Sequence, residues 1–189
     1  MGKKLNYFYS IRTCLIFCVF VFSFNYTIAQ EVILDTLLNK NVLIGNIEIE
    51  HIQDSLWFKE NLFSDSLDNA VIPGSKDVHI NNFAKIIELL DVAETIHVDA
   101  YFGSWCSDSH TWIPYFYFFS KRVGIDDNIK LVGLPKSQKY RVLNFPDKNI
   151  IKVPTFIVYL NGEELGRIVE NPISSFSLDF LSILKKNPK

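Results

Sequence analysis

Cysteine is scarce in this chain, neither charge sign has a surplus, and no apolar run is long enough to span a membrane. Three cysteines in 189 residues are too few for a small scaffold held together by disulfides. Lysine and arginine number 19 against 21 acids, so no basic surplus is available for binding nucleic acid. Hydrophobic residues make up 48% of the sequence and aromatic residues 14%. This composition excludes a disordered chain, and the length suits one domain with an extension.

The first 29 residues are predicted to be a secretory signal peptide. A basic start without acids is followed by an apolar run from Cys14 to Phe24 and a small-residue exit at Ala29. The run is shorter than the roughly 20 residues that a spanning helix needs, and retention as an anchor is the alternative. We therefore expect an exported protein, periplasmic or secreted, with no membrane span once the segment is cleaved before Gln30.

Export would leave Cys106 as the one remaining thiol. Cys14 and Cys18 both lie within the predicted signal peptide. One cysteine cannot form an internal disulfide. In an oxidising compartment such a thiol is either inertly buried or chemically used.

The residues after the signal peptide divide into an extension and a regular domain. Residues 30–74 form the N-terminal extension and linker, with a short strand or loop over 41–50, then a helix, then a linker over 64–75. From 75 to 189 the pattern predicts, in order, a helix from 77, a strand over 95–102, a helix to 122, a strand over 129–134, strands over 154–160 and 164–169, and a helix over 174–186. This order indicates an α/β fold with a central mixed sheet flanked by helices.

The most informative segment is the predicted strand-to-helix turn that contains Cys106. The free amide groups and the dipole at the start of a helix stabilise a thiolate and expose a nucleophile. Ser109 lies about one helical turn farther on, where its hydroxyl can donate a hydrogen bond to the sulfur. His110 can do the same when protonated, whereas the negative charge of Asp108 repels a thiolate. We expect Asp108 and His110 to modulate the site.

This segment and three later markers carry a resemblance to the thioredoxin-like superfamily. The stretch 105–109, Trp-Cys-Ser-Asp-Ser, resembles that family's Trp-Cys-x-x-Cys active site. Pro114 falls where thioredoxins carry a proline that kinks the active-site helix. The stretch 153–155, Val-Pro-Thr, resembles the cis-proline loop, and Asn161-Gly162 matches the last hairpin. The resemblance covers residues from about 75 to 186.

The resemblance implies a thioredoxin-like fold and a set of site residues. The family's cis-proline loop faces the active-site cysteine and pairs with extended substrate backbone, so a cis bond before Pro154 is expected. Cys106 and Ser109 would be the catalytic residues. The residues implied for substrate binding are Trp105, Val153, Pro154 and Thr155.

Two departures from the family bear on the chemistry. Ser109 stands in place of the second cysteine, so the resolving thiol is absent. The buried acid of thioredoxins aligns with Ala100, and Asp99 lies one residue away, on the opposite face of the strand. Both features needed for the second half of dithiol exchange are therefore missing. The chain resembles exported monothiol variants of the superfamily.

Two functions of different classes follow from these residues. The first is monothiol thiol-disulfide exchange through Cys106, of the isomerase or deglutathionylation type. Its partner would be a client protein or peptide with a disulfide or thiol, with a small thiol as a further partner. The second is a non-catalytic thioredoxin-like binding module of the cell envelope. Partner binding should survive the change of Cys106 to alanine in the second case alone.

Metal and peroxide chemistry have less support in the sequence. Cys106, Asp108 and His110 offer three candidate ligands at one place, whereas tight zinc sites normally have four. A peroxidase would react through its one cysteine, but the sequence pattern arranges no arginine beside Cys106. We expect no metal and no cofactor.

Overall fold

The computed structural model describes residues 30–62, 76–91 and 95–186. The predicted signal peptide and the predicted linker over 64–75 lie outside these residues. No helix among the described residues is long and apolar enough to cross a membrane. The elements are β1 Glu31–Asp35, β2 Lys40–Ile47, α1 Glu50–Gln53, α2 Leu56–Leu62, α4 Lys76–Asp91, β3 Ile96–Phe102, α5 Ser107–Val123, η1 Asp126–Asn128, β4 Ile129–Gly133, α6 Gln138–Asn144, η2 Pro146–Lys148, β5 Thr155–Leu160, β6 Glu163–Val169 and α7 Phe176–Leu184.

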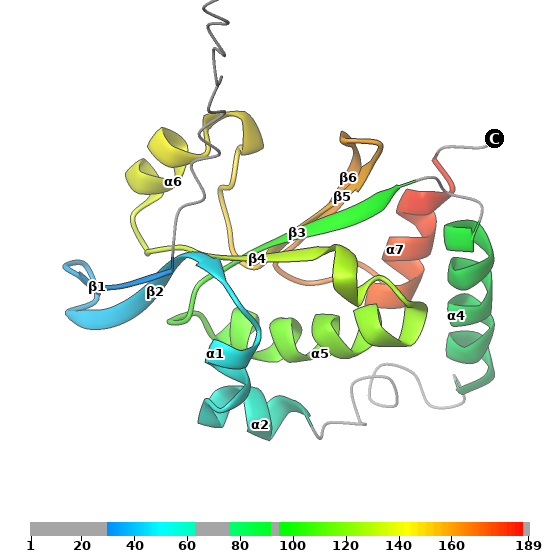
Figure 1. The fold of residues 1–189 in the computed structure, drawn as a ribbon, viewed down its shortest axis with the longest axis horizontal. Helices are drawn as coiled ribbons and strands as arrows, with labels where there is room; N and C mark the ends of the chain where they lie inside the picture. The colour runs from blue at the N-terminus through cyan, green and yellow to red at the C-terminus, as the bar shows by residue number, and fades with distance from the viewer. Residues whose placement is uncertain (1–29, 63–75, 92–94, 187–189) are drawn as a thin grey trace, which may run out of the picture.

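Six strands of the described residues form one mixed sheet in the order β1-β2-β4-β3-β5-β6. Strands β3 and β4 run parallel, and the other neighbours pair antiparallel. In Figure 1, α4, α5 and α7 lie on one side of the sheet and α6 on the other. The expected α/β fold, with a central mixed sheet flanked by helices and an N-terminal extension, is confirmed.

Strand β3 separates two clusters of buried side chains because successive side chains of a strand point to opposite faces. Ile96, Val98, Ala100 and Phe102 belong to the large cluster beneath the helices. Tyr101 belongs to a smaller cluster on the α6 side. The inward position of Ala100 agrees with the expected alternation along this strand.

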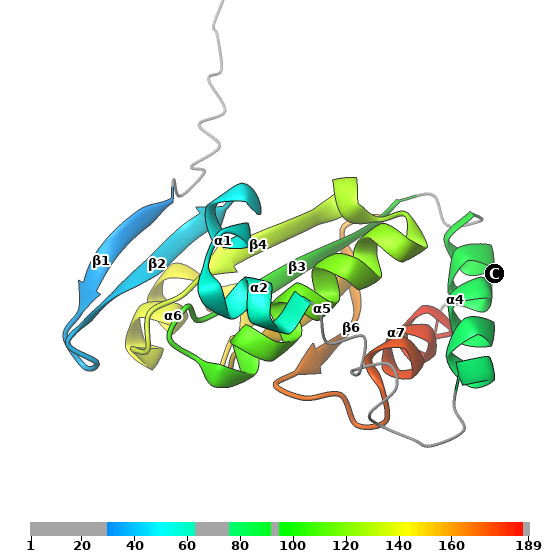
Figure 2. The same cartoon turned by 90° about the horizontal axis from the view of Figure 1, so that it is seen from below.

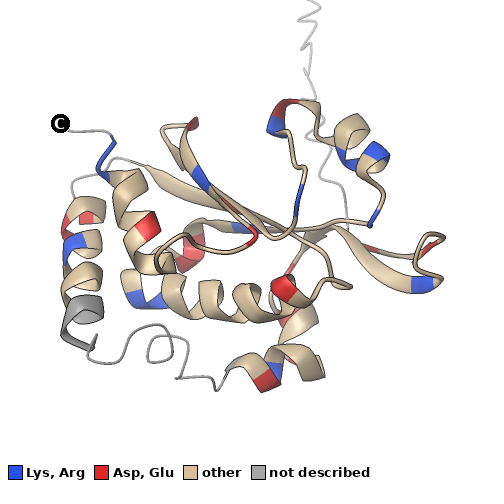
Figure 3. Ribbon diagram, turned by 180° about the vertical axis from the view of Figure 1, so that it is seen from behind, with Lys and Arg blue, Asp and Glu red and all other residues tan. Residues whose placement is uncertain are grey.

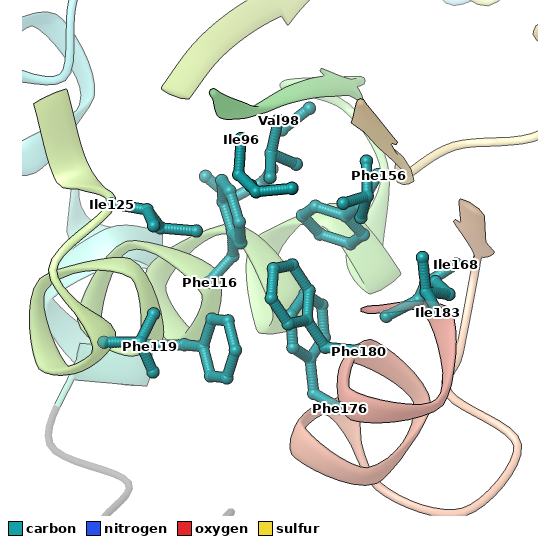
Figure 4. Packing of buried hydrophobic residues seen from close by; sticks show 14 of the residues in the cluster. Ile96, Val98, Phe116, Phe119, Ile125, Phe156, Ile168, Phe176, Phe180 and Ile183 are labelled. Carbon is teal, nitrogen blue, oxygen red and sulfur yellow. The ribbon is translucent and has the colours of Figure 1, made fainter. Parts of the chain in front are cut away.

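Phenylalanines form the centre of the large cluster, which Figure 4 shows at close range. The rings of Phe116 and Phe156 lie 4.9 Å apart, and those of Phe119 and Phe180 also lie 4.9 Å apart. Phe176 sits between them, in edge-to-face contact with Phe156 at 5.0 Å. Such tilted arrangements place the positive edge of one ring against the negative face of another. The helix α5 is thereby fixed beneath the sheet.

The N-terminal extension is part of the same sheet. Strand β2 pairs with β4, and β1 adds a further strand that the sequence pattern did not predict. The close approach requires Gly133, because a Cβ at that position would lie 2.6 Å from the carbonyl oxygen of Leu43. Helix α2 packs on α5, where Phe58 lies against Tyr117. Figure 2 shows α1 and α2 beside α5.

Candidate functional site

Cys106 lies where the sequence pattern places it, at the start of α5. It is the N-cap residue, with φ −99° and ψ 125°, and its side chain makes no capping hydrogen bond. Its backbone N–H donates to the carbonyl of Gly103 at 2.9 Å, which closes the turn after β3. The sulfur is partly buried, and its S–H donates to the carbonyl oxygen of Val153 at 3.4 Å. The thiol therefore lies against the loop that precedes β5.

Trp105 is held beside the cysteine by a hydrogen bond and by a glycine. Its indole Nε1 donates to the carbonyl of Leu134 at 2.8 Å. A Cβ on Gly103 would lie 2.6 Å from the indole ring, so the ring can cover the turn only because residue 103 is glycine. Trp105 and Cys106 both pack on the smaller cluster of buried residues.

The expected cis-proline loop faces the sulfur. The Val153-Pro154 peptide bond is cis, as the resemblance implied. The Thr155 hydroxyl donates to the carbonyl of Lys152 at 2.7 Å, and the threonine is almost fully buried. The structure therefore brings Trp105, Val153 and Pro154 to the neighbourhood of Cys106 and turns the Thr155 hydroxyl toward the backbone.

Ser109 and His110 contact other groups than the sulfur. The fully buried Ser109 hydroxyl accepts the N–H of Gly103 at 3.2 Å, which stabilises the turn. The Nε2 of His110 lies 2.8 Å from the carbonyl oxygen of Ser104. Its ring stacks on Trp57 at 4.6 Å, with 14° between the planes. Among the described residues, no hydrogen bond joins either side chain to Cys106, which differs from the expectation.

The N-terminal extension borders this site. The N–H of Leu43 in β2 donates to the hydroxyl of Ser104 at 3.0 Å, directly before Trp105. The carboxylate of Asp35 in β1 accepts the N–H of Lys136 at 2.7 Å, at the entrance to α6. These two contacts and the Trp57 stack connect the extension to both sides of the cysteine.

Arg141 is the site residue that the sequence analysis missed. It lies on α6, and its guanidinium donates to the carbonyls of Ile151 at 2.7 Å and Lys136 at 3.1 Å. Burial lowers the pKa of Arg141, and the negative charge that Cys106 can carry raises it. The sequence pattern arranges no arginine beside Cys106, and Arg141 reaches the loop that the sulfur contacts only once the chain is folded. Sequence reasoning failed here because most arginines are solvated, and nothing in the 136–151 pattern marks one as buried.

Asp99 lies on β3, in the middle of the sheet. It is 7% exposed and accepts a hydrogen bond from the hydroxyl of Tyr101 at 3.3 Å. Burial, followed by the charge of Asp99, raises the pKa of Tyr101. Within the described ranges, no three His, Cys, Asp or Glu side chains gather as metal ligands.

Comparison with known proteins finds similarity among solved structures. No family model matches the sequence, and no curated protein matches it. A protein of unknown function from Pseudomonas aeruginosa, PA1234, is 16% identical over 74% of this chain and 92% of its own, with a TM-score of 0.49. A scaffold carrying an HIV epitope is 16% identical over 69% of this chain and 98% of its own, with a TM-score of 0.40. Neither name assigns an activity to this chain.

Proposed function

We propose that this chain is an exported, thioredoxin-like protein that catalyses monothiol thiol-disulfide exchange through Cys106. One observation carries the proposal. The only cysteine of the described residues is a free, partly buried thiol at the start of a 17-residue helix, with its sulfur against the loop before β5. Helix starts favour a thiolate, which is the attacking form of the side chain.

The chemistry consists of two exchanges at one sulfur. The Cys106 thiolate attacks one sulfur of a client disulfide, forming a mixed disulfide and expelling the other client sulfur as a thiolate. A second thiolate, from the client or from a small thiol, then attacks the client sulfur of that mixed disulfide. This step expels the Cys106 thiolate unchanged. No net oxidation or reduction of the protein occurs, which suits isomerisation or deglutathionylation.

The contact between Cys106 and Val153 suggests where the backbone of a client would bind. While Cys106 is protonated, its S–H donates a hydrogen bond to the Val153 carbonyl. Ionisation removes that proton, so the carbonyl becomes available to an N–H of an extended client. The exposed side chain of Ile151 lies in the same loop and offers an apolar contact beside it. Attack and client docking are thereby coupled in one small region.

A matched set of variants tests the proposal. The full chain is incubated with a peptide–glutathione mixed disulfide and reduced glutathione, and the release of free peptide is measured over time. Wild type and Ser109→Ala should both accelerate release, since Ser109 serves the turn. Cys106→Ser should show only the uncatalysed rate. Equal rates for wild type and Cys106→Ser would overturn the proposal and leave the binding module as the remaining interpretation.

A further inference from the structure

Arg141 is buried without an acidic partner. It is 7% exposed, whereas arginines are almost never this buried unless they are paired. The Lys–Asp, Lys–Glu and Arg–Glu ion pairs of the described residues do not include it. A buried charge is strongly destabilising unless an opposite charge or good hydrogen bonds compensate it. The environment of Arg141 must therefore supply that compensation.

The hydrogen bonds of Arg141 provide part of the compensation. The terminal nitrogens donate to the carbonyls of Ile151 and Lys136. The Nε atom is buried and has no hydrogen-bond partner among the described residues. Carbonyl oxygens contribute dipoles, but neither is a counter-charge. One donor and the net charge of the guanidinium remain uncompensated.

Asp35 is linked to Arg141 through Lys136, but its carboxylate already accepts other hydrogen bonds. Asp35 accepts the N–H groups of Leu37, Leu38 and Lys136, so it is bound to backbone. On the loop side, Lys152 is paired with Glu170. On the helix side, Asp108 lies in the first turn of α5. Figure 3 shows acidic and basic positions interspersed over the ribbon, with basic ones on α6.

Cys106 and Arg141 meet at the same loop. Arg141 binds the carbonyl of Ile151, and the sulfur contacts the carbonyl of Val153, a close neighbour in that loop. Burial lowers the pKa of the Arg141 guanidinium, and a negative charge on Cys106 raises it. A buried, incompletely bonded cation and an ionisable sulfur thus bind carbonyls of the same loop, two residues apart.

We propose that Arg141 is a positioning residue whose guanidinium acts as the counterion of the Cys106 thiolate. This inference rests on the proposed function for its chemical meaning. The guanidinium stabilises the thiolate that attacks, and it stabilises the same thiolate when the mixed disulfide is resolved. A better stabilised thiolate leaves faster. In a chain with Ser109 where a resolving thiol would be, Arg141 therefore assists release of the client.

The test compares two alkylating reagents of nearly equal size, neutral iodoacetamide and anionic iodoacetate. The full-length chain is used, and modification is read at the Cys106 peptide by mass spectrometry, so Cys14 and Cys18 do not interfere. The variants are Arg141→Met, Arg141→Lys and Arg122→Met, the last an arginine at the far end of α5. The pH is fixed where wild type reacts at half its maximal rate.

Arg141→Met should lower the iodoacetamide rate about fivefold or more, because loss of a nearby opposite charge shifts an ionisation equilibrium by at least about tenfold and wild type is half ionised at this pH. It should lower the iodoacetate rate several-fold further, because the attraction for the anionic reagent is also lost. Arg141→Lys, which keeps the charge, should recover most of both rates. Arg122→Met should match wild type.

Three results would overturn the inference. Equal changes for both reagents in Arg141→Met would mean that only access to the sulfur changed. Failure of Arg141→Lys to recover the iodoacetate preference would mean that charge is not the property that matters. Equal reactivity of all variants in urea confirms that the comparison concerns the folded state. Peptide release separates the two proposals. Unaltered release by Arg141→Met would sink this inference alone, whereas a wild-type protein with a normal iodoacetate preference but no Cys106-dependent release would sink the proposed function alone.

Discussion

The two faces of β3 show how one strand serves stability on one side and polar chemistry on the other. Ile96, Val98 and Phe102 face the helices and pack into the phenylalanine cluster. On the opposite face, Tyr101 donates to Asp99, whose carboxylate also lies 4.0 Å from His97. Side chains on the first face stabilise the fold through buried apolar area and close packing alone. Every buried polar group on the second face also needs a hydrogen-bond partner. Buried polar groups are therefore the places to look for function in this chain.

Cys106 and Arg141 belong to the second side of the sheet. The cysteine packs on the cluster that contains Tyr101 and Val153. Arg141 lies on α6, which covers the same side (Figure 1). Changes in the phenylalanine cluster should therefore alter stability and spare the sulfur's reactivity, whereas changes near α6 should alter that reactivity.

The largest expected effect is on stability, from Phe176→Ala. The Phe176 ring lies 5.0 to 5.9 Å from the rings of Phe116, Phe119 and Phe156, and the residue is buried. Its loss leaves a cavity and should lower the free energy of unfolding by about 3–5 kcal/mol. Urea denaturation measures this, and alkylation of Cys106 in the folded chain serves as the control. A loss below about 1 kcal/mol, or a large change in Cys106 reactivity, would contradict the separation of the two faces.

Alkaline pH tests the polar face. Burial raises the pKa of Tyr101 above its ordinary value of 10.0, so the unfolded chain loses this proton first. The stability that this tyrosine contributes is complete below about pH 10 and declines as the pH rises, by about 1.4 kcal/mol per unit. Tyr101→Phe should remove most of this decline between pH 10 and 11 in urea denaturation. Tyr159→Phe should remove less, because Lys148 donates to that hydroxyl and opposes the shift in its pKa. Equal declines in wild type and Tyr101→Phe would count against this account.

Ser109→Cys should convert the site to a dithiol. The new thiol lies one helical turn from Cys106, while the hydrogen bond to Gly103 is weakened at a cost of about 1 kcal/mol. We expect an intramolecular disulfide, detected as loss of free thiols at residues 106 and 109, and reduction of a model protein disulfide that wild type cannot complete. A variant that folds but never forms that disulfide would show that the turn holds the two side chains apart.

The smallest effect is expected from His110→Gln. Its imidazole contacts the Ser104 carbonyl and the Trp57 ring, so its removal should change the reactivity of the Cys106 sulfur very little. Alkylation of Cys106 should change less than threefold, while stability falls by about 1 kcal/mol from the lost stack. Trp57→Leu should give the same stability loss. A tenfold change in alkylation by His110→Gln would place the histidine, rather than Arg141, beside the thiolate.

Local patterns predicted the parts of the fold that depend on neighbouring residues. The start of α5 at Cys106, the inward position of Ala100 and the cis bond before Pro154 all follow from short motifs or strand alternation. Long-range contacts were not predictable in this way. The Leu43–Ser104 hydrogen bond spans 61 residues and the Asp35–Lys136 hydrogen bond spans 101.

Arg141 was missed for the same reason. Its burial depends on carbonyl oxygens supplied by both ends of the 136–151 segment, and no spacing rule connects an arginine to a cysteine thirty-five positions earlier. The strand β1 was not predicted because it has only five residues, too few for a clear alternation of apolar and polar side chains, and most of its side chains are exposed. Both features are visible only when the chain is folded.

The central claim is that folding makes Cys106 more reactive toward disulfides. The direct measurement is the rate at which oxidised glutathione forms a mixed disulfide at Cys106, read by mass spectrometry in the folded full-length chain and in the same chain in urea. We expect faster reaction in the folded chain, with reduced glutathione rapidly restoring the free thiol. A folded chain that reacts more slowly than the unfolded one would contradict it.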